Sequence, residues 1–88
     1  MNLVYTKAIT KDVRKIKDQK TKNAVLEIIQ NIKKASTLKE VPSLKKMSGH
    51  PSAYRIRIGI YRMGLYFEDD TVILARFLKR NDIYKVFP

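Results

Sequence analysis

Cysteine is absent from the 88-residue sequence, so neither disulfides nor thiolate metal ligands can supplement its core. His50 is the only histidine, which excludes an acid–base pair of two histidines. The three glycines are scattered, so the chain has no glycine-rich phosphate loop. No apolar run approaches the roughly 18 residues that span a membrane, and no apolar signal segment follows the N-terminus. We therefore expect a small domain that works in the cytoplasm.

Acidic residues are also scarce, and the resulting charge is the strongest signal in the composition. Nineteen Lys and Arg residues against eight Asp and Glu residues give a net charge of +11. Such an excess on a small domain favours a polyanionic partner, namely RNA, DNA or a strongly acidic protein. At this length we expect one domain over residues 1–88.

The basic residues are of two kinds, which separate along the chain. Residues 1–50 carry eleven of the thirteen lysines, and residues 51–88 carry five of the six arginines. Lysine is a hydrated point charge that suits a solvated surface, whereas arginine can hold phosphate oxygens in a bidentate geometry. The second half of the chain therefore predicts a binding site built from its arginines, which are Arg55, Arg57, Arg62, Arg76 and Arg80.

A strand and a first helix are predicted near the N-terminus. Residues 2–6 are a short strand candidate. Thr10 is expected to cap the first helix and Asp12 to lie in its first turn, where a carboxylate suits the helix dipole. Val13 and Ile16 are the residues that this helix should bury.

A second helix is predicted from about residue 21 to residue 35. Its apolar residues recur with the i, i+4 spacing of one buried stripe, while polar residues fall on the other side. The stripe consists of Ala24, Val25, Ile28, Ile29, Ile32 and Ala35. Residues 36–51 lose this periodicity and contain Pro42, Gly49 and Pro51, so we expect a loop that exposes His50.

From Tyr54 onward the period of the apolar residues changes to two, which predicts β-strands. Gly59 and Ile60 fit a two-residue turn of type II′, because the first position of that turn needs a positive φ. In this register Arg57 lies directly opposite Arg62 on the neighbouring strand.

A second tight turn at Glu68–Thr71 leads to the last predicted strand, residues 72–78. Strands joined by tight turns pair antiparallel, and the amphipathic helices must cover the apolar face. The expected fold class is therefore α+β, with helices on one side of an antiparallel sheet. The three carboxylates of the turn point in different directions, so we interpret them as a solvated hairpin tip and predict no metal site.

The predicted register gathers Arg55, Arg57 and Arg62 on the sheet face that the helices leave uncovered. Like charges opposite one another destabilise a sheet, so three arginines at one place need compensation. An oxyanion such as phosphate accepts several arginine side chains at once. A solvated polar surface is sufficient explanation for any single arginine, but the three together favour an anion-binding site.

The segment YRIRIGIYRMGLYFEDDTVILARFLKRNDIYKVF resembles the C-terminal half of the RelE/ParE family of bacterial toxins, and the match covers about residues 49–87. The resemblance implies a RelE-like fold, in which an N-terminal strand and a two-helix hairpin pack on one face of the sheet. Family members of the RelE type cut mRNA, usually in the ribosomal A site, whereas members of the ParE type poison DNA gyrase.

The resemblance implies the toxin of a type II toxin–antitoxin system that acts as an mRNA endoribonuclease, or mRNA interferase. Cleavage would proceed on the ribosome by attack of the 2′-hydroxyl on the neighbouring phosphate, with neither a metal nor a cofactor. The implied partner is an acidic, partly disordered antitoxin that folds on binding and covers the arginine face. A ParE-like gyrase inhibitor and a non-catalytic RNA- or ribosome-binding module remain as alternatives.

The catalytic residues of the RelE type correspond here to Arg55, Arg57, Arg62, Arg80 and Tyr84. Arg57 and Arg62 would stabilise the phosphorane, and Arg80 would share that charge or neutralise the leaving group. Tyr84 would stack on a substrate base and act as a base. Further contacts with the substrate are expected from Lys45, Lys46, Tyr66 and Lys79. Lys79 stands where many relatives have histidine, and no equivalent of the catalytic glutamate of other relatives is evident.

Overall fold

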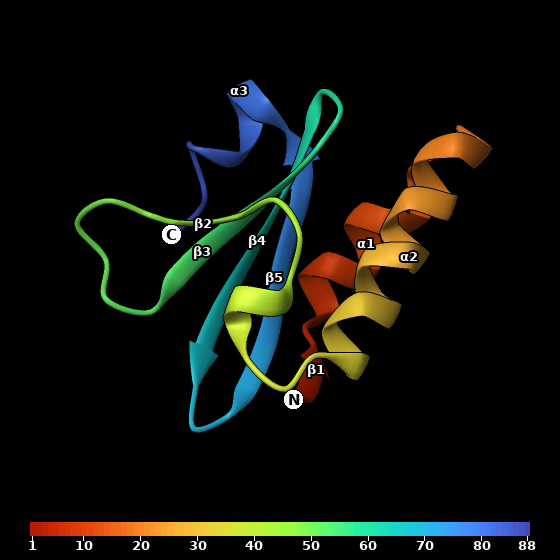
Figure 1. Cartoon of the computed structure of the whole chain (residues 1–88). Coiled ribbons are helices and arrows are strands. Elements are labelled where there is room, and N and C mark those ends of the chain that lie inside the picture. The colour runs from red at the N-terminus through yellow and green to blue at the C-terminus, as the bar shows by residue number, and fades with distance from the viewer.

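The computed structural model of the chain describes residues 1–88 as a five-stranded sheet with three α-helices. The elements are β1 (Asn2–Tyr5), α1 (Lys7–Arg14), α2 (Gln19–Lys34), a 3₁₀ helix (Leu38–Glu40), β2 (Leu44–Lys46), β3 (Ala53–Ile58), β4 (Tyr61–Glu68), β5 (Thr71–Lys79) and α3 (Arg80–Ile83). Figure 1 shows α1 and α2 on one side of the sheet and the C-terminal tail on the other. This architecture confirms the predicted α+β class. None of the helices has the length and apolar character needed to cross a membrane.

The sheet is mixed, with the strand order β1-β5-β4-β3-β2. The predicted antiparallel pairing is found between β3 and β4 and between β4 and β5, and β2 adds an antiparallel pair with β3 that was not predicted. β1 pairs with β5 in parallel. After β1 the chain forms both helices and enters the sheet again at the opposite edge, as β2. The following strands are then added in order, so that β5 ends up beside β1. The first and last strands are therefore neighbours, and the N-terminal strand is held against β5, the strand that precedes the C-terminal tail.

The β3–β4 hairpin has the predicted register, with Ile58 opposite Tyr61 and Arg57 opposite Arg62. Gly59 has a φ of +58°, as the first position of the predicted turn requires. The main core lies between this sheet and the two long helices. Its fully buried members include Ile9, Val25, Ile32, Ile56, Met63, Leu65, Val72, Leu74 and Phe77.

The first helix begins earlier than predicted, because Thr6 and not Thr10 is its N-cap. The Thr6 hydroxyl accepts a hydrogen bond from the Ile9 backbone N–H and donates to the carbonyl oxygen of Leu74 on β5. This contact ties the start of α1 to the sheet, which a cap at Thr10 would not do. Of the two residues expected to be buried, Ile16 is buried just beyond the helix and Val13 is half-buried.

Asp12 is buried in the last turn of α1 and does not serve as a charge in its first turn. β1 ends at Tyr5, so the edge of β5 beyond Leu74 has no strand beside it. The Asp12 carboxylate takes that place, since it accepts a hydrogen bond of 3.0 Å from the backbone N–H of Phe77. A buried backbone donor must find an acceptor, and Asp12 supplies one to Phe77, which is why this carboxylate lies in the interior and not at the start of the helix.

The second helix agrees with its prediction in extent and in its buried stripe. Val25 and Ile32 are fully buried, and Ile28 and Ile29 are half-buried against the core. Asp18 caps the helix and accepts hydrogen bonds from Thr21 and from the backbone N–H of Lys20, and the Thr21 hydroxyl bond contributes most to lowering the pKa of Asp18.

Residues 36–51 are more ordered than the predicted loop. They contain the 3₁₀ helix and the edge strand β2, in which Lys45 lies opposite Arg55 of β3. β2 has only three residues, so it offers no alternation that a sequence pattern could reveal. Its strand conformation depends on hydrogen bonds to β3, which are not local.

A second, smaller core covers part of the sheet face opposite α1 and α2, which was predicted to be left uncovered by the helices. Ile83 of α3 and Phe87 of the tail pack there against Ala53 and Ala75. The Phe87 ring lies directly on Gly64, where an added Cβ would come within 2.6 Å of it. The tail therefore folds back over the sheet, and it bounds the arginine face.

Candidate active site

A cleft of about 480 Å³ lies between the tip of the β3–β4 hairpin and the beginning of α3. We call it the arginine cleft. Its lining is strongly basic and consists of Arg57, Gly59, Ile60, Arg62, Lys79, Arg80, Asn81 and Asp82. Four of the predicted site residues, Arg57, Arg62, Lys79 and Arg80, are thus brought together.

Backbone hydrogen bonds position the cationic side chains of the arginine cleft. The hairpin register places Arg57 and Arg62 opposite each other on one face. Lys79 ends β5 opposite Tyr61, and the next residue, Arg80, donates its backbone N–H to the carbonyl oxygen of Ile60 at 2.9 Å. The tail is therefore fastened to the hairpin tip, so that cations separated by about twenty residues meet at one place.

Arg62 is the buried member of this group, with 8% of its surface exposed. Its Nη1 donates to the carbonyl oxygens of Gly59 at 2.9 Å and Tyr61 at 2.8 Å, which fixes the guanidinium against the turn. Its buried Nε has no acceptor. A buried charge without a counter-ion is costly, and a bound anion would offset that cost.

The positive charge of the cleft is not neutralised by ion pairs. Arg57, Arg62, Lys79 and Arg80 make no salt bridge. Asp82 is the one carboxylate in the lining, and it lies 4.0 Å from Lys85 outside the cleft. Several cations around one space favour a ligand that presents several negative oxygens, such as a phosphodiester.

Arg55 and Lys45 lie on the same sheet face as the cleft but outside it. They are directly opposite each other on β3 and β2, and Arg55 also faces Gly64 on β4. Both are free of ion pairs. They extend the positive surface from the cleft toward the edge strand, where a longer polyanion could pass.

Tyr66 and Tyr84 also lie outside the cleft. The Tyr66 ring is placed between those of His50 and Phe87, at centroid distances of 5.6 Å and 5.1 Å. Tyr84 follows α3 with 47% of its surface exposed, which leaves its ring free to stack on a base. Lys46 is opposite Tyr54 and so falls on the helix side of the sheet, away from the cations of the cleft.

Arg76 does not join the arginine group that the sequence suggested. Its Nε and Nη2 donate to the two carboxylate oxygens of Asp12 at 2.8 Å and 3.1 Å. This hydrogen bonding to Asp12 raises the pKa of Arg76 above its usual value. The pair joins α1 to β5, so Arg76 serves the fold and is not available to a ligand.

Sequence reasoning missed two polar residues of the lining, Asn81 and Asp82. They are the two residues that follow Arg80, and this proximity to a predicted site residue was the signal that could have identified them. Asp82 places a carboxylate among the cations of the cleft, which the sequence analysis did not predict.

The chain is similar along almost its whole length to proteins named as RelE toxins. It is 34% identical over 89 residues to Toxin RelE3 of Methanocaldococcus jannaschii, with all of both chains covered. No protein-family model matches it.

Solved structures show the same fold. A chain of the RelB–RelE antitoxin–toxin complex from Methanococcus jannaschii superimposes with a TM-score of 0.81 at 30% identity, covering 97% of this chain and 99% of that one. A chain of the intact E. coli RelBE toxin–antitoxin complex gives a TM-score of 0.70 at 17% identity, covering 89% and 94%. At that lower identity the likeness concerns the fold alone.

Proposed function

The chain belongs to the RelE family of toxins, and from that premise we propose that it is the toxin of a toxin–antitoxin pair and an mRNA endoribonuclease. Its substrate is mRNA held in the ribosomal A site, and its partner is an acidic antitoxin. The relative of known structure was crystallised as an antitoxin–toxin complex, which supports an antitoxin as the partner of this chain.

The observation that carries the enzymatic part of the proposal is the state of Arg62. Its guanidinium is buried, lies among three other cations and has no carboxylate partner. The scissile phosphate of RNA would supply the missing negative charge. A structural arginine would be expected to have a partner of its own, as Arg76 has in Asp12.

In the proposed reaction the 2′-oxygen of one nucleotide attacks the adjacent phosphorus and the bond from phosphorus to the 5′-oxygen breaks. The products are a 2′,3′-cyclic phosphate and a 5′-hydroxyl end. Arg57 and Arg62 face the same space and would bind the two non-bridging oxygens as their charge develops. Positioned cations of this kind usually contribute the largest single catalytic effect.

The reaction also needs a group that takes the proton of the 2′-hydroxyl. We assign this role to Asp82, since it is the carboxylate that lines the cleft. Tyr84, the base expected from the resemblance, lies outside that lining and would instead stack on the base of the substrate. The two assignments differ in a measurable way, because Asp82→Asn would lower the rate at saturating substrate and Tyr84→Phe would not.

The leaving 5′-oxygen needs a proton or a neutralising cation. Lys79 and Arg80 are both exposed and stand together where β5 passes into α3. The Lys79 ammonium would donate the proton to the 5′-oxygen, and Arg80 would stabilise the charge that accumulates before that transfer. Lys79 would thereby fill the place that histidine has in many relatives.

Induced expression with primer extension on cellular mRNA tests this function. Wild type should arrest growth and produce discrete mRNA breaks, and Arg62→Ala and Arg80→Ala should lose both effects. Lys33→Ala, which removes an exposed charge on α2 outside the cleft, is the control and should behave as wild type. Arrest with intact mRNA and damaged DNA would instead identify a gyrase inhibitor.

A further inference from the structure

A second cleft lies beside the arginine cleft, on the other side of the turn between β3 and β4, and we call it the tip cleft. Its volume is about 480 Å³, and its walls are the hairpin tip and the beginning of α2. Figure 1 shows this turn between α3 and the first turn of α2. The side chains that give the tip cleft its character are Asp18, Lys20, Thr21, Ile58, Ile60 and Tyr61.

The two clefts share a wall, because Gly59, Ile60 and Lys79 line both of them. An RNA whose scissile phosphate lies in the arginine cleft can therefore place a neighbouring nucleotide in the tip cleft. In the proposed reaction Lys79 faces the leaving 5′-oxygen. The neighbour on this side is then the nucleotide that carries the 5′-oxygen, which is the one that follows the scissile phosphate.

The tip cleft differs in chemistry from the arginine cleft. Ile58, Ile60 and Tyr61 give it an apolar wall. The Tyr61 ring is held in place by stacking on Phe77, at a centroid distance of 5.0 Å and an interplanar angle of 12°. Apolar and aromatic side chains of this kind receive the flat faces of nucleobases. The tip cleft thus suits a base, whereas the arginine cleft suits a phosphate.

The beginning of α2 is not free to bind an anion. The backbone N–H groups of Lys20 and Thr21 already donate to the Asp18 carboxylate, at 3.3 Å and 3.2 Å. That carboxylate is exposed at the edge of the tip cleft, where it would repel a phosphate and accept hydrogen bonds from N–H groups. Adenine, guanine and cytosine carry exocyclic amino groups. Uracil carries none, and its one N–H group lies between two carbonyl oxygens that a carboxylate repels.

Ile60 projects between the two clefts from a fixed backbone, and 64% of its surface is exposed. Its carbonyl oxygen accepts the backbone N–H of Arg80 at 2.9 Å. The carbonyl oxygens of Gly59 and Tyr61, on either side of it, accept from the Arg62 guanidinium. A single exposed apolar residue is ordinary on a protein surface. One that is fixed at the edge of a phosphate-binding cleft matches the apolar wedges that part stacked bases.

We propose that the tip cleft binds the base of the nucleotide that follows the scissile phosphate, and that Ile60 separates this base from the preceding one. In a stacked strand the 2′-oxygen is not in line with the bond from phosphorus to the 5′-oxygen, so parting the two nucleotides favours attack. Ile60 is thus a positioning residue, and Asp18 selects the base. The inference rests on the proposed function, because it takes the arginine cleft as the place of the scissile phosphate.

Cleavage of mRNA on programmed ribosomes tests the role of Ile60. Ile60→Ala should lower the rate at saturating protein by about 10- to 100-fold, with little change in the protein concentration that gives half of that rate. Ile60→Leu keeps the apolar bulk and should cleave at nearly the wild-type rate. A wild-type rate for Ile60→Ala, or an Ile60→Leu variant as slow as Ile60→Ala, would overturn the inference.

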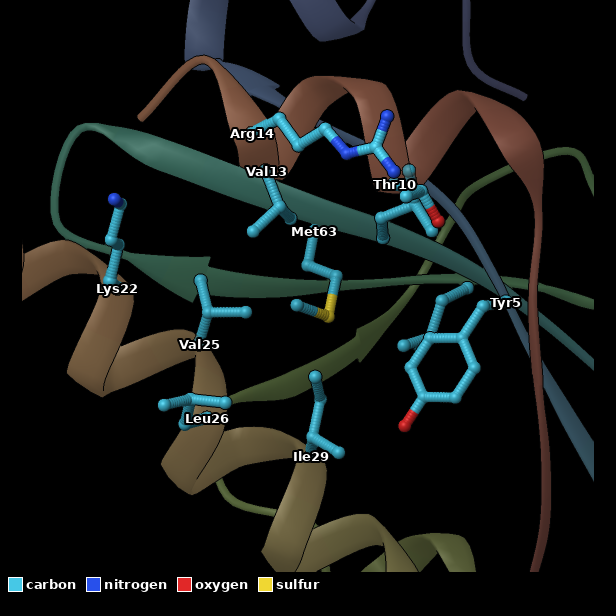
Figure 2. Close-up of a pocket in the computed structure, with 11 residues that line it drawn as sticks. Tyr5, Thr10, Val13, Arg14, Lys22, Val25, Leu26, Ile29 and Met63 are labelled. Atoms are coloured by element: carbon cyan, nitrogen blue, oxygen red, sulfur yellow. The ribbon is translucent and has the colours of Figure 1, made fainter. Parts of the chain in front are cut away.

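Leu26→Ala is the matched control for Ile60→Ala. Leu26 is similarly exposed, at 59%, and lies outside both clefts. Figure 2 shows it on α2, where it lines the pocket between α1 and α2. Its loss should leave the cleavage rate unchanged.

Messages that differ only in the nucleotide after the scissile phosphate test the role of Asp18. Wild type should cleave before a base with an exocyclic amino group roughly tenfold faster than before uracil. Asp18→Asn keeps an oxygen that caps α2 but removes the charge, so this ratio should fall toward one. No preference in wild type, or an equal preference in Asp18→Asn, would contradict the placement of the base in the tip cleft.

Backbone amide NMR shifts on titration with 2′-O-methylated ApA, which cannot be cleaved, separate this inference from the proposed activity. The amides of Thr21 and Ala24 in the tip cleft should shift together with those of Arg57 and Arg62. Unshifted amides in the tip cleft would overturn the inference, and shifts confined to the arginine cleft would leave the proposed function intact. Shifts in both clefts from a wild type that cleaves no RNA would support the base site while the ribonuclease proposal fails.

Discussion

Arg57 and Arg62 are directly opposed on β3 and β4, so two guanidinium groups share one face of a tight hairpin. Like charges in opposed positions destabilise a sheet, and Arg62 is in addition buried without a counter-ion. We therefore expect the pair to weaken the free protein, and we propose that it serves to bind an anion.

Arg62→Met should separate the two properties. An apolar side chain of similar length replaces a buried unpaired charge, so the free energy of unfolding should stay the same or rise by about 1 kcal/mol. Cleavage of mRNA should fall by roughly 100-fold or more, since one cation of the transition state is lost. Urea denaturation and a cleavage assay measure the two effects. A variant that fails to fold would show instead that Arg62 is needed to hold the hairpin.

The buried contact between Asp12 and Arg76 should contribute strongly to stability. Asp12→Ala removes the acceptor of both the Arg76 guanidinium and the Phe77 backbone N–H. The free energy of unfolding should fall by about 2–4 kcal/mol. The loss is somewhat smaller than for a fully buried pair, because the Arg76 side chain is 30% exposed. Asp12→Asn retains an acceptor and should cost less. Equal effects of the two substitutions in thermal denaturation would contradict this explanation.

Gly64 should tolerate no larger residue, because Phe87 occupies the space above it. A Cβ at residue 64 would lie 2.6–2.8 Å from three atoms of the Phe87 ring. Gly64→Ala should displace the tail, lower stability by about 1–3 kcal/mol and reduce cleavage, since the tail carries Arg80. The double variant Gly64→Ala/Phe87→Leu should recover part of the stability. Additive losses in that double variant would mean that the two residues do not interact.

Stability should decline in acid partly through Glu40. Its carboxylate accepts hydrogen bonds from the backbone N–H groups of Thr37 and Ser36, at 2.8 Å and 2.7 Å, and these hold the pKa of Glu40 below its usual 4.5. A group whose pKa is lower in the folded than in the unfolded protein stabilises the fold at pH values above its unfolded pKa. That stabilisation is lost as the pH falls through its folded pKa. Melting temperatures measured from pH 6 to about pH 3 should therefore fall less steeply for Glu40→Gln. Glu27→Gln, an exposed carboxylate on α2, is the control and should follow wild type.

The parts of the fold that could be predicted from the sequence are those with local determinants. The Gly59–Ile60 turn and the alternation around it define the β3–β4 register, and hence the opposition of Arg57 and Arg62. The apolar stripe of α2 likewise belongs to one continuous segment. Both predictions are confirmed.

The parts that could not be predicted depend on residues distant in sequence. Asp12 and Arg76 are 64 positions apart, and nothing near either residue indicates that they pair. β2 becomes a strand through β3, and β1 lies parallel to a strand that the chain forms last. For the same reason the sequence grouped Arg76 with the binding arginines and did not recognise Asp82 as part of the cleft.

The most direct test of the arginine cleft as a catalytic site is cleavage of an mRNA on programmed ribosomes by purified protein. Arg80→Gln is the decisive variant, because Arg80 is exposed and its side chain makes no ion pair, so the fold should not change. Lys33→Gln, the control, removes one positive charge from the exposed side of α2, outside the cleft. We predict that wild type and Lys33→Gln cleave at equal rates while Arg80→Gln is slower by roughly 10- to 100-fold. Equal rates for all three proteins, or no cleavage by wild type, would contradict the account.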